Sequence, residues 1–220
     1  MVEGHYKIDD MNRPDFSNYL AHFTKDSELS ANDESNPVWS YKDMNAQEKL
    51  ISILESKVIK ASSMPWTNAR AVCFTECPWS SLIAHTQKYS AYGIGFSKKI
   101  VYAKNGGPVY YMRPDHYDEQ MQGNGFVKHV LPFITPFAPK YSPVKIKKAF
   151  SQTVDYSHER EWRVPHDFPF NYKDISFIIL NDYDDMAKFP KQLKDAIGRD
   201  KFILIENYKQ IETLWPVHKL

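Results

Sequence analysis

The chain has 220 residues, with 28 lysines and arginines against 27 aspartates and glutamates, so its net charge favours neither nucleic acid nor an anionic membrane as a partner. Hydrophobic residues make up 42% of the sequence and aromatic residues 15%, a composition that excludes an intrinsically disordered protein. No stretch reaches the roughly 18 consecutive apolar residues of a membrane-spanning helix. The length fits one domain that buries a core without a disulfide or a metal.

The cysteine content indicates a reducing compartment. Cys73 and Cys77 lie four residues apart on one strand-like segment, where they are badly placed for a mutual disulfide. With no second cysteine pair nearby, a zinc site is not expected. The first residues lack the apolar stretch of a secretory signal, so we expect a cytoplasmic protein.

The N-terminal part of the chain divides into an arm, a strand and a loop. Residues 1–18 are polar and predict a loose arm, followed by a single domain over 19–220. The segment 19–24 is a short strand candidate. Residues 25–45 are polar, without a hydrophobic period, and read as a surface loop.

A helix is predicted over residues 46–60, where apolar residues recur at helical spacing. Asn45 is a suitable N-cap, and Glu48 stands three residues later in the position of a capping box. The apolar positions are Leu50, Ile51, Leu54, Val58 and Ile59.

The remaining elements are mostly short strands that follow one another without a helix between them. This order predicts an α+β fold rather than alternating strands and helices. The strands are expected over 71–75, 92–96, 108–112, 161–164, 175–180 and 201–205, and the helices over 78–85, 98–104, 115–131 and 184–197, with a turn at Gly106-Gly107.

Two segments at strand ends carry polar groups suited to a ligand. His22 offers a ring nitrogen and Thr24 a hydroxyl to a bound sugar. Arg70 precedes a strand, where a guanidinium is able to bind phosphate with two hydrogen bonds. The alternatives are a structural histidine and a surface ion pair.

Two further segments favour stacking and acid–base chemistry. Tyr89 and Tyr92 stand beside glycines that let a planar ligand approach, although core packing explains the same pattern. On a strand, Glu159 and Glu161 point to one face while Arg160 and Trp162 point to the other. Two carboxylates on one face indicate a site, and the alternative is a charged edge strand.

The order of these short motifs, from about Tyr19 to Val164, resembles the AbiGi family of abortive-infection (phage resistance) proteins. The chain is more distantly similar to ADP-ribosyltransferases of the DarT type, which modify DNA. The motifs are His22-Phe-Thr, Arg70, Cys73-Phe-Thr-Glu, Tyr92-Gly-Ile-Gly-Phe and Glu159-Arg-Glu-Trp-Arg.

The second resemblance implies two small bent sheets, with flanking helices, that hold NAD between them as the substrate of a mono-ADP-ribosyltransferase. It places His22, Thr24 and Arg70 on the polar part of NAD, and Tyr89 and Tyr92 on the nicotinamide. It makes Glu161 the catalytic carboxylate and Glu159 its auxiliary, without a metal. Such a carboxylate stabilises the positive charge that develops on the ribose. The acceptor would be a nucleic acid or a protein.

The resemblance to AbiGi, a family also described as an antitoxin, implies a non-catalytic binding module with a cognate toxin as its partner. A basic, aromatic stretch at 140–150 offers contacts to single-stranded nucleic acid, although a solvated loop has the same composition. A metal-dependent nuclease built on Glu159, Glu161 and Asp155 is a third alternative.

Overall fold

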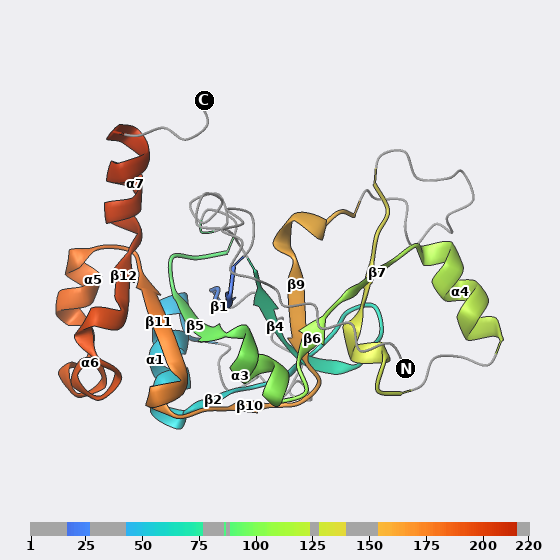
Figure 1. Ribbon diagram of the computed structural model, residues 1–220, viewed down its shortest axis with the longest axis horizontal. Helices are drawn as coiled ribbons and strands as arrows, with labels where there is room; N and C mark the ends of the chain where they lie inside the picture. The colour runs from blue at the N-terminus through green and yellow to red at the C-terminus, as the bar shows by residue number, and fades with distance from the viewer. Residues whose placement is uncertain are drawn as a thin grey trace, which may run out of the picture.

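The computed structural model describes residues 17–26, 43–76, 86, 89–123, 128–139 and 154–214 (Figure 1). Several expected features lie outside these residues: most of the N-terminal arm, most of the loop at 25–45, the helix at 78–85, Cys77 and the basic stretch at 140–150.

Within the described residues, strands form one eight-stranded sheet and two two-stranded sheets, which confirms the α+β class. In place of two small sheets, one large sheet dominates. Its order is β12-β11-β5-β1-β4-β9-β6, with β3 paired to β4. Only β11 and β12 in it run parallel. The strands are β1 (Tyr19–Phe23), β3 (Ser62–Ser63), β4 (Arg70–Thr75), β5 (Gly93–Ser97), β6 (Gly107–Pro108), β9 (Glu161–Val164), β11 (Ile175–Leu180) and β12 (Phe202–Leu204).

The two small sheets flank the large one. In the first, β2 (Val58–Ile59) pairs with β10 (Phe168–Pro169). In the second, β7 (Tyr110–Met112) and β8 (Ile134–Pro136) run parallel, and α4 (Pro114–Gln122) lies between them in the chain. A short 3-10 helix, η2 (Leu131–Phe133), leads into β8.

The main core lies on one face of the large sheet, against α1 (Ala46–Ser56). The predicted stripe is buried at Leu50 and Leu54, and its side chains pack with those of alternate sheet residues such as Ile94 and Ile178. Asn45 caps α1, and the expected capping box with Glu48 is present.

The opposite face of the sheet carries a smaller cluster, made by the residues that alternate with the main core. Phe177 and Ile179 of β11 pack there with Ala21 of β1 and with Ile205, the first residue of α7 (Ile205–Leu214). Gly95 lies between them on β5, beneath the Phe177 ring, and a Cβ atom at this position would overlap that ring. The Gly-Ile-Gly pattern therefore makes room for aromatic side chains of neighbouring strands.

Several predicted helix ends are wrong, each for a local reason. The first helix ends at Ser56 rather than residue 60, because Lys57 adopts a left-handed conformation (φ 55°) and β2 follows. The helix expected at 184–197 is two helices, α5 (Tyr183–Lys188) and α6 (Lys191–Ile197), because Pro190 interrupts the hydrogen bonding between them.

Two other predicted segments are also shorter than expected. The helix expected at 115–131 is α4, which ends at Gln122, and the strand expected at 108–112 is divided between β6 and β7. Gly107, expected in a turn, begins β6. The helical turn expected at 98–104 is α3 (Lys98–Ala103).

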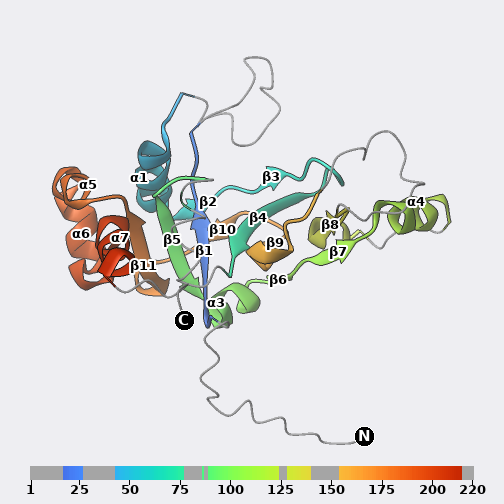
Figure 2. The same ribbon diagram turned by 90° about the horizontal axis from the view of Figure 1, so that it is seen from above.

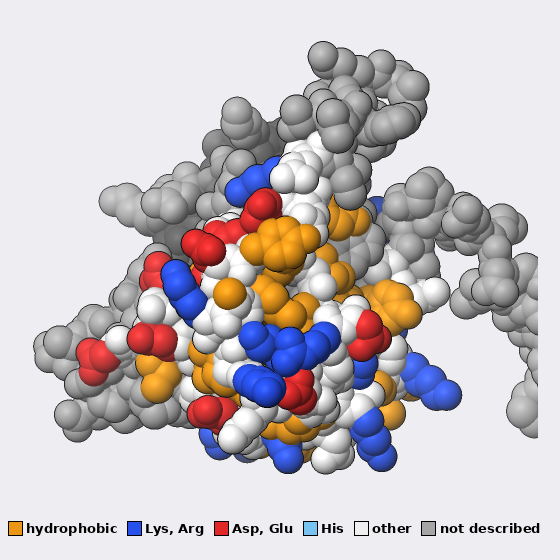
Figure 3. Space-filling view, turned by 90° about the vertical axis from the view of Figure 1, so that its left-hand side faces the viewer, with side chains coloured by type: hydrophobic (Ala, Val, Ile, Leu, Met, Phe, Trp, Pro, Cys, Tyr) orange, Lys and Arg blue, Asp and Glu red, His pale blue; other side chains and the backbone are white. Residues whose placement is uncertain are grey.

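The helices α5, α6 and α7 lie at one end of the molecule, and α4 with β7 lies at the other (Figures 1 and 2). Figure 3 shows lysine and arginine side chains beside aspartate and glutamate side chains at the end of the molecule that carries these helices. One ion pair of α6 joins Asp195 to Arg199, with Oδ1 and Nη2 2.7 Å apart. Among the described residues, no helix combines the length and apolar character needed to cross a membrane.

The close approach of Gly95 to Phe177 gives a first testable prediction. We expect Gly95→Ala to lower the free energy of unfolding by about 1–3 kcal/mol, because the added methyl group overpacks the sheet face. Chemical denaturation measures this loss. Gly107→Ala is the matched control, since the nearest atom to its added Cβ would be 3.7 Å away, an ordinary contact. The double variant Gly95→Ala, Phe177→Leu should be more stable than the summed losses of the two single variants imply, because the smaller leucine leaves room for the methyl group. If it is not, the overlap with the Phe177 ring is not the cause of the loss in Gly95→Ala.

Candidate functional site

A pocket of about 730 Å³ opens on the same face of the sheet as Phe177, over β1, β4 and β9. The register explains which side chains meet there: Ala21 stands opposite Thr75, Thr75 opposite Glu161, and Cys73 opposite Arg163. These residues belong to one face, because cross-strand partners share a side of the sheet. The pocket is lined by Ala21, His22, Phe23, Lys25, Ser62, Ser63, Met64, Pro65, Trp66, Cys73, Phe74, Thr75, Tyr89, Ile134, Thr135, Pro136, Val154, Tyr156, Glu159, Glu161 and Arg163.

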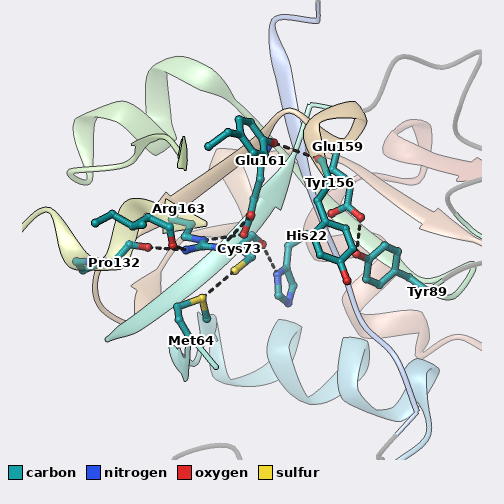
Figure 4. A network of polar contacts seen from close by, with 11 residues as sticks. His22, Met64, Cys73, Tyr89, Pro132, Tyr156, Glu159, Glu161 and Arg163 are labelled. Carbon is teal, nitrogen blue, oxygen red and sulfur yellow. Dashed lines mark hydrogen bonds and ion pairs between the residues drawn. The ribbon is translucent and has the colours of Figure 1, made fainter. Parts of the chain in front are cut away.

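Glu161 is held by Arg163, two residues along β9 and on the same face. The guanidinium donates from Nε and Nη2 to the two carboxylate oxygens, at 2.7 and 3.0 Å. Its Nη1 donates to the carbonyl oxygens of Pro132 and Ile134, both at 2.9 Å (Figure 4). Arg163 is only 6% exposed. Every guanidinium nitrogen therefore donates to a protein acceptor, as a buried charge requires.

The His22 ring is oriented by a hydrogen bond to the backbone of β4. Its Nδ1 lies 2.8 Å from the carbonyl oxygen of Cys73. Because a carbonyl only accepts, Nδ1 carries a proton, and in the neutral form of the ring Nε2 is the acceptor. Burial of the ring lowers the pKa of His22 below 6.5, against the smaller opposing effect of that hydrogen bond. Burial and the nearby Glu161 also raise the pKa of the Cys73 thiol, which donates to the Met64 sulfur at 3.7 Å.

Glu159 reaches the pocket from a 3-10 turn, η4 (Ser157–Glu159), and not from the strand predicted for it. Arg160 follows in a left-handed conformation (φ 43°), so the strand begins only at Glu161. The premise of a shared strand face was therefore wrong, although both carboxylates line the same pocket. Glu159 is 8% exposed and accepts a hydrogen bond from the Tyr89 hydroxyl at 2.7 Å. Burial and this contact raise the pKa of Tyr89.

Residues 45–195 match the family model described as "Putative abortive phage resistance protein AbiGi, antitoxin". The chain belongs to the AbiGi family. No curated protein and no solved structure gave a match that would extend this assignment. The AbiGi resemblance expected from the motif order is thus confirmed, while no comparison supports the similarity to DarT.

In this AbiGi protein, four of the expected site residues line the pocket together: His22, Tyr89, Glu159 and Glu161. They come from distant parts of the chain and converge on one hollow (Figure 4). The strand register places Glu161, the turn before β9 places Glu159, and hydrogen bonds to the Cys73 carbonyl and to Glu159 hold His22 and Tyr89 beside them.

The other expected site residues lie elsewhere. The Arg70 side chain is exposed and pairs with Asp167 at 3.3 Å. The Thr24 hydroxyl is buried and donates to the carbonyl of Ala46 at 2.7 Å. Tyr92 packs against the main core and donates its hydroxyl proton to Asp185 at 2.7 Å. The structure describes all three of these residues, and none of them lines the pocket.

Arg163, Tyr156 and Trp66 also line the pocket, although the sequence motifs did not predict them as residues of the site. Arg163 could have been predicted from the sequence, because residues two apart on a strand share a face. Glu161 and Arg163 are two apart on the predicted strand 161–164. Trp66 lies in the turn between β3 and β4, and its ring packs against the ring of Tyr117 in α4, with the centroids 4.2 Å apart and the planes tilted by 38°. No local pattern predicts that contact.

The described part of the chain contains no group of three or more His, Cys, Asp or Glu side chains placed to hold a metal ion. The Asp155 carboxylate, expected as a third acidic ligand, accepts hydrogen bonds from the hydroxyl and the backbone N–H of Ser157.

The buried pair gives the second prediction. Arg163→Met should lower the free energy of unfolding by about 3–5 kcal/mol, because Glu161 is left as a buried charge without its partner. The double variant Arg163→Met, Glu161→Gln should recover at least about 1 kcal/mol of this loss. Urea denaturation of both variants measures the difference.

Arg113→Met is the matched control, because Arg113 also pairs with a carboxylate two residues away, Asp115, but on the surface. Its stability should equal that of the wild type within error. An equal loss in Arg113→Met and Arg163→Met would contradict a structural role that is special to the buried pair.

Proposed function

We propose that this protein is the antitoxin of an abortive-infection system and that it acts by binding, with the pocket as its recognition site. Membership of the AbiGi family supports the phage-defence role, and its antitoxin description implies a cognate toxin as partner. A pocket of this size, lined mainly by apolar and aromatic side chains with a few converging polar groups, is typical of a binding site.

The state of Glu161 is the observation that carries the proposal. A catalytic carboxylate stabilises charge on a substrate, and it does so best when it is aimed at the reacting atoms. Here both carboxylate oxygens accept from Arg163, and the guanidinium is in turn held by two backbone carbonyls. This arrangement supports a role for Glu161 in holding the pocket wall.

NAD binding and cleavage is the second candidate, favoured by the convergence of His22, Tyr89, Glu159 and Glu161 on one pocket. The pyrophosphate of NAD needs a cation, and the resemblance assigns that role to Arg70. Arg70 is instead paired with Asp167 outside the pocket lining, and Arg163 is engaged with Glu161. These residues do not fit NAD in the way that the resemblance implies.

The third prediction separates the two candidates by their chemistry. We expect no NAD cleavage by the wild type above the background rate, with or without nucleic-acid acceptors. We also expect calorimetric titrations of NAD into Arg70→Ala to equal those into the wild type. The proposal fails if the wild type cleaves NAD and Glu161→Gln or Glu159→Gln lowers the rate by about 100-fold.

The fourth prediction addresses the antitoxin role in cells. Expression of the wild type together with the toxin of the same defence system should restore growth. Tyr156→Asp, which places a charge on the rim of the pocket, should restore it less well, and Tyr183→Asp, at an exposed position on α5, should equal the wild type. Equal rescue by all three proteins would remove the pocket from the toxin contact.

A further inference from the structure

The hydroxyl of Thr135 is the group in the pocket that points to a ligand. Thr135 lies on β8, lines the pocket and is only 4% exposed. Within the described residues its hydroxyl makes no hydrogen bond, whereas every side-chain nitrogen or oxygen that is sealed from solvent there has a partner. The hydroxyl is therefore open to the pocket. A nearly buried polar group of this kind favours a ligand that offers it a hydrogen bond.

Thr24 provides a comparison within the same chain. It is also 4% exposed, but its hydroxyl donates to the backbone carbonyl of Ala46 at 2.7 Å. The backbone of Thr135 is held in place as well, because the carbonyl of the preceding residue, Ile134, accepts from Arg163 at 2.9 Å. The fold thus fixes the position of the Thr135 hydroxyl without using the hydroxyl itself.

Two further uncharged groups of the lining are available to a ligand. Ser62 of β3 is half-buried, and its hydroxyl makes no hydrogen bond within the part of the chain that the structure describes. His22 uses Nδ1 for the Cys73 carbonyl, which leaves Nε2. Because burial lowers the pKa of His22 below 6.5, the ring is neutral at pH 7 and Nε2 accepts. The available groups are one acceptor and two hydroxyls, which both donate and accept.

The charged side chains of the lining, in contrast, are already engaged. Arg163 and Glu161 form a pair that is electrically neutral. Glu159 accepts from Tyr89, and Lys25 has an interaction partner of its own. A charged ligand would compete with these contacts, whereas an uncharged ligand leaves them intact. The lining therefore favours a ligand without net charge.

An amide group matches the available partners. Its N–H donates to an acceptor such as Nε2 of His22, and its carbonyl accepts from a hydroxyl such as that of Thr135. A polyhydroxylated ligand such as a sugar has more polar groups than a mainly apolar lining provides for, and burying those groups unpaired is unfavourable.

We propose that the pocket recognises an uncharged amide, and that the Thr135 hydroxyl selects it with His22 and Ser62 as further partners. The inference rests on the proposed function, in which the protein acts by binding. Within a toxin partner the amide would be a glutamine or asparagine side chain, and a free source would be a ring amide such as the hypoxanthine of a nucleoside.

The test is a titration followed by calorimetry and NMR. The probes for a protein side chain are Nα-acetyl-glutamine N-methylamide and its glutamate analogue, which has the same shape and a negative charge. We expect the glutamine probe to bind, and the glutamate probe to bind at least about tenfold more weakly, because the pocket would bury its charge without a partner.

Inosine tests a free ring amide, and 1-methylinosine, in which the ring N–H is blocked, is its control. Binding of inosine, but of neither 1-methylinosine nor the glutamine probe, supports the same site with a free ligand.

A change of one hydroxyl to a methyl group tests the role of Thr135. Thr135→Val should weaken binding of the amide probe at least about fivefold, through loss of one hydrogen bond. The same substitution should leave the midpoint of urea denaturation at or above that of the wild type, because the hydroxyl has no protein partner to lose. Thr135→Ser keeps the hydroxyl and should bind like the wild type.

Thr24→Val is the matched control, because it removes a hydroxyl of equal burial that is bonded within the protein. It should lower the midpoint of denaturation and leave binding of the probe unchanged, since Thr24 does not line the pocket.

Three results would overturn the inference: no binding of the glutamine probe or of inosine, equal binding of the glutamine and glutamate probes, or a Thr135→Val protein that binds like the wild type. These failures differ from a failure of the proposed function, which would be seen as NAD cleavage by the wild type.

Discussion

The burial of one guanidinium group constrains the arrangement around the pocket. Arg163 lies inside the protein, so its charge and its N–H groups must be met by acceptors that water would otherwise supply. Glu161 supplies the negative charge and accepts from Nε and Nη2, and the carbonyls of Pro132 and Ile134 accept from Nη1. These bonds tie β9 of the large sheet to η2 and β8. Tyr111 of β7 adds a second tie, since its hydroxyl accepts from the Glu161 N–H at 3.2 Å. The small β7–β8 sheet is thereby positioned as a wall of the pocket.

The same constraint separates the roles of the two glutamates. Glu161 is used to satisfy Arg163, and its position follows from the strand register. Glu159 is free of that register because it lies in the turn before β9, where Arg160 adopts a left-handed conformation and pairs with Glu76 at 3.9 Å. The backbone carbonyl of Glu159 accepts a hydrogen bond from the Thr75 hydroxyl at 2.6 Å, and this bond anchors the turn to β4. One carboxylate thus belongs to the scaffold, while the other lines the pocket from a turn.

Local patterns predicted the elements well where the signal was local. The stripe and cap of α1 and the strands over Tyr19–Phe23, Arg70–Thr75 and Ile175–Leu180 follow from hydrophobic period and capping chemistry. The helix ends were harder, because Lys57 leaves the helix through a left-handed residue that is not glycine. The site was predicted only in part, because its geometry depends on pairings between distant segments. His22 meets Cys73 across 51 residues and Tyr89 meets Glu159 across 70, and no periodicity encodes either contact.

The acceptors that hold Nη1 of Arg163 are backbone carbonyls, so the contact tolerates amino-acid substitution in the segment that provides them. A carbonyl is present at every position whatever the side chain, so the anchor of β8 survives most substitutions in that strand. Thr135 and Pro136 of β8 nevertheless line the pocket. Substitution of these two side chains is therefore able to change the shape and polarity of the pocket wall, while the backbone anchor that supports the wall is inherited intact.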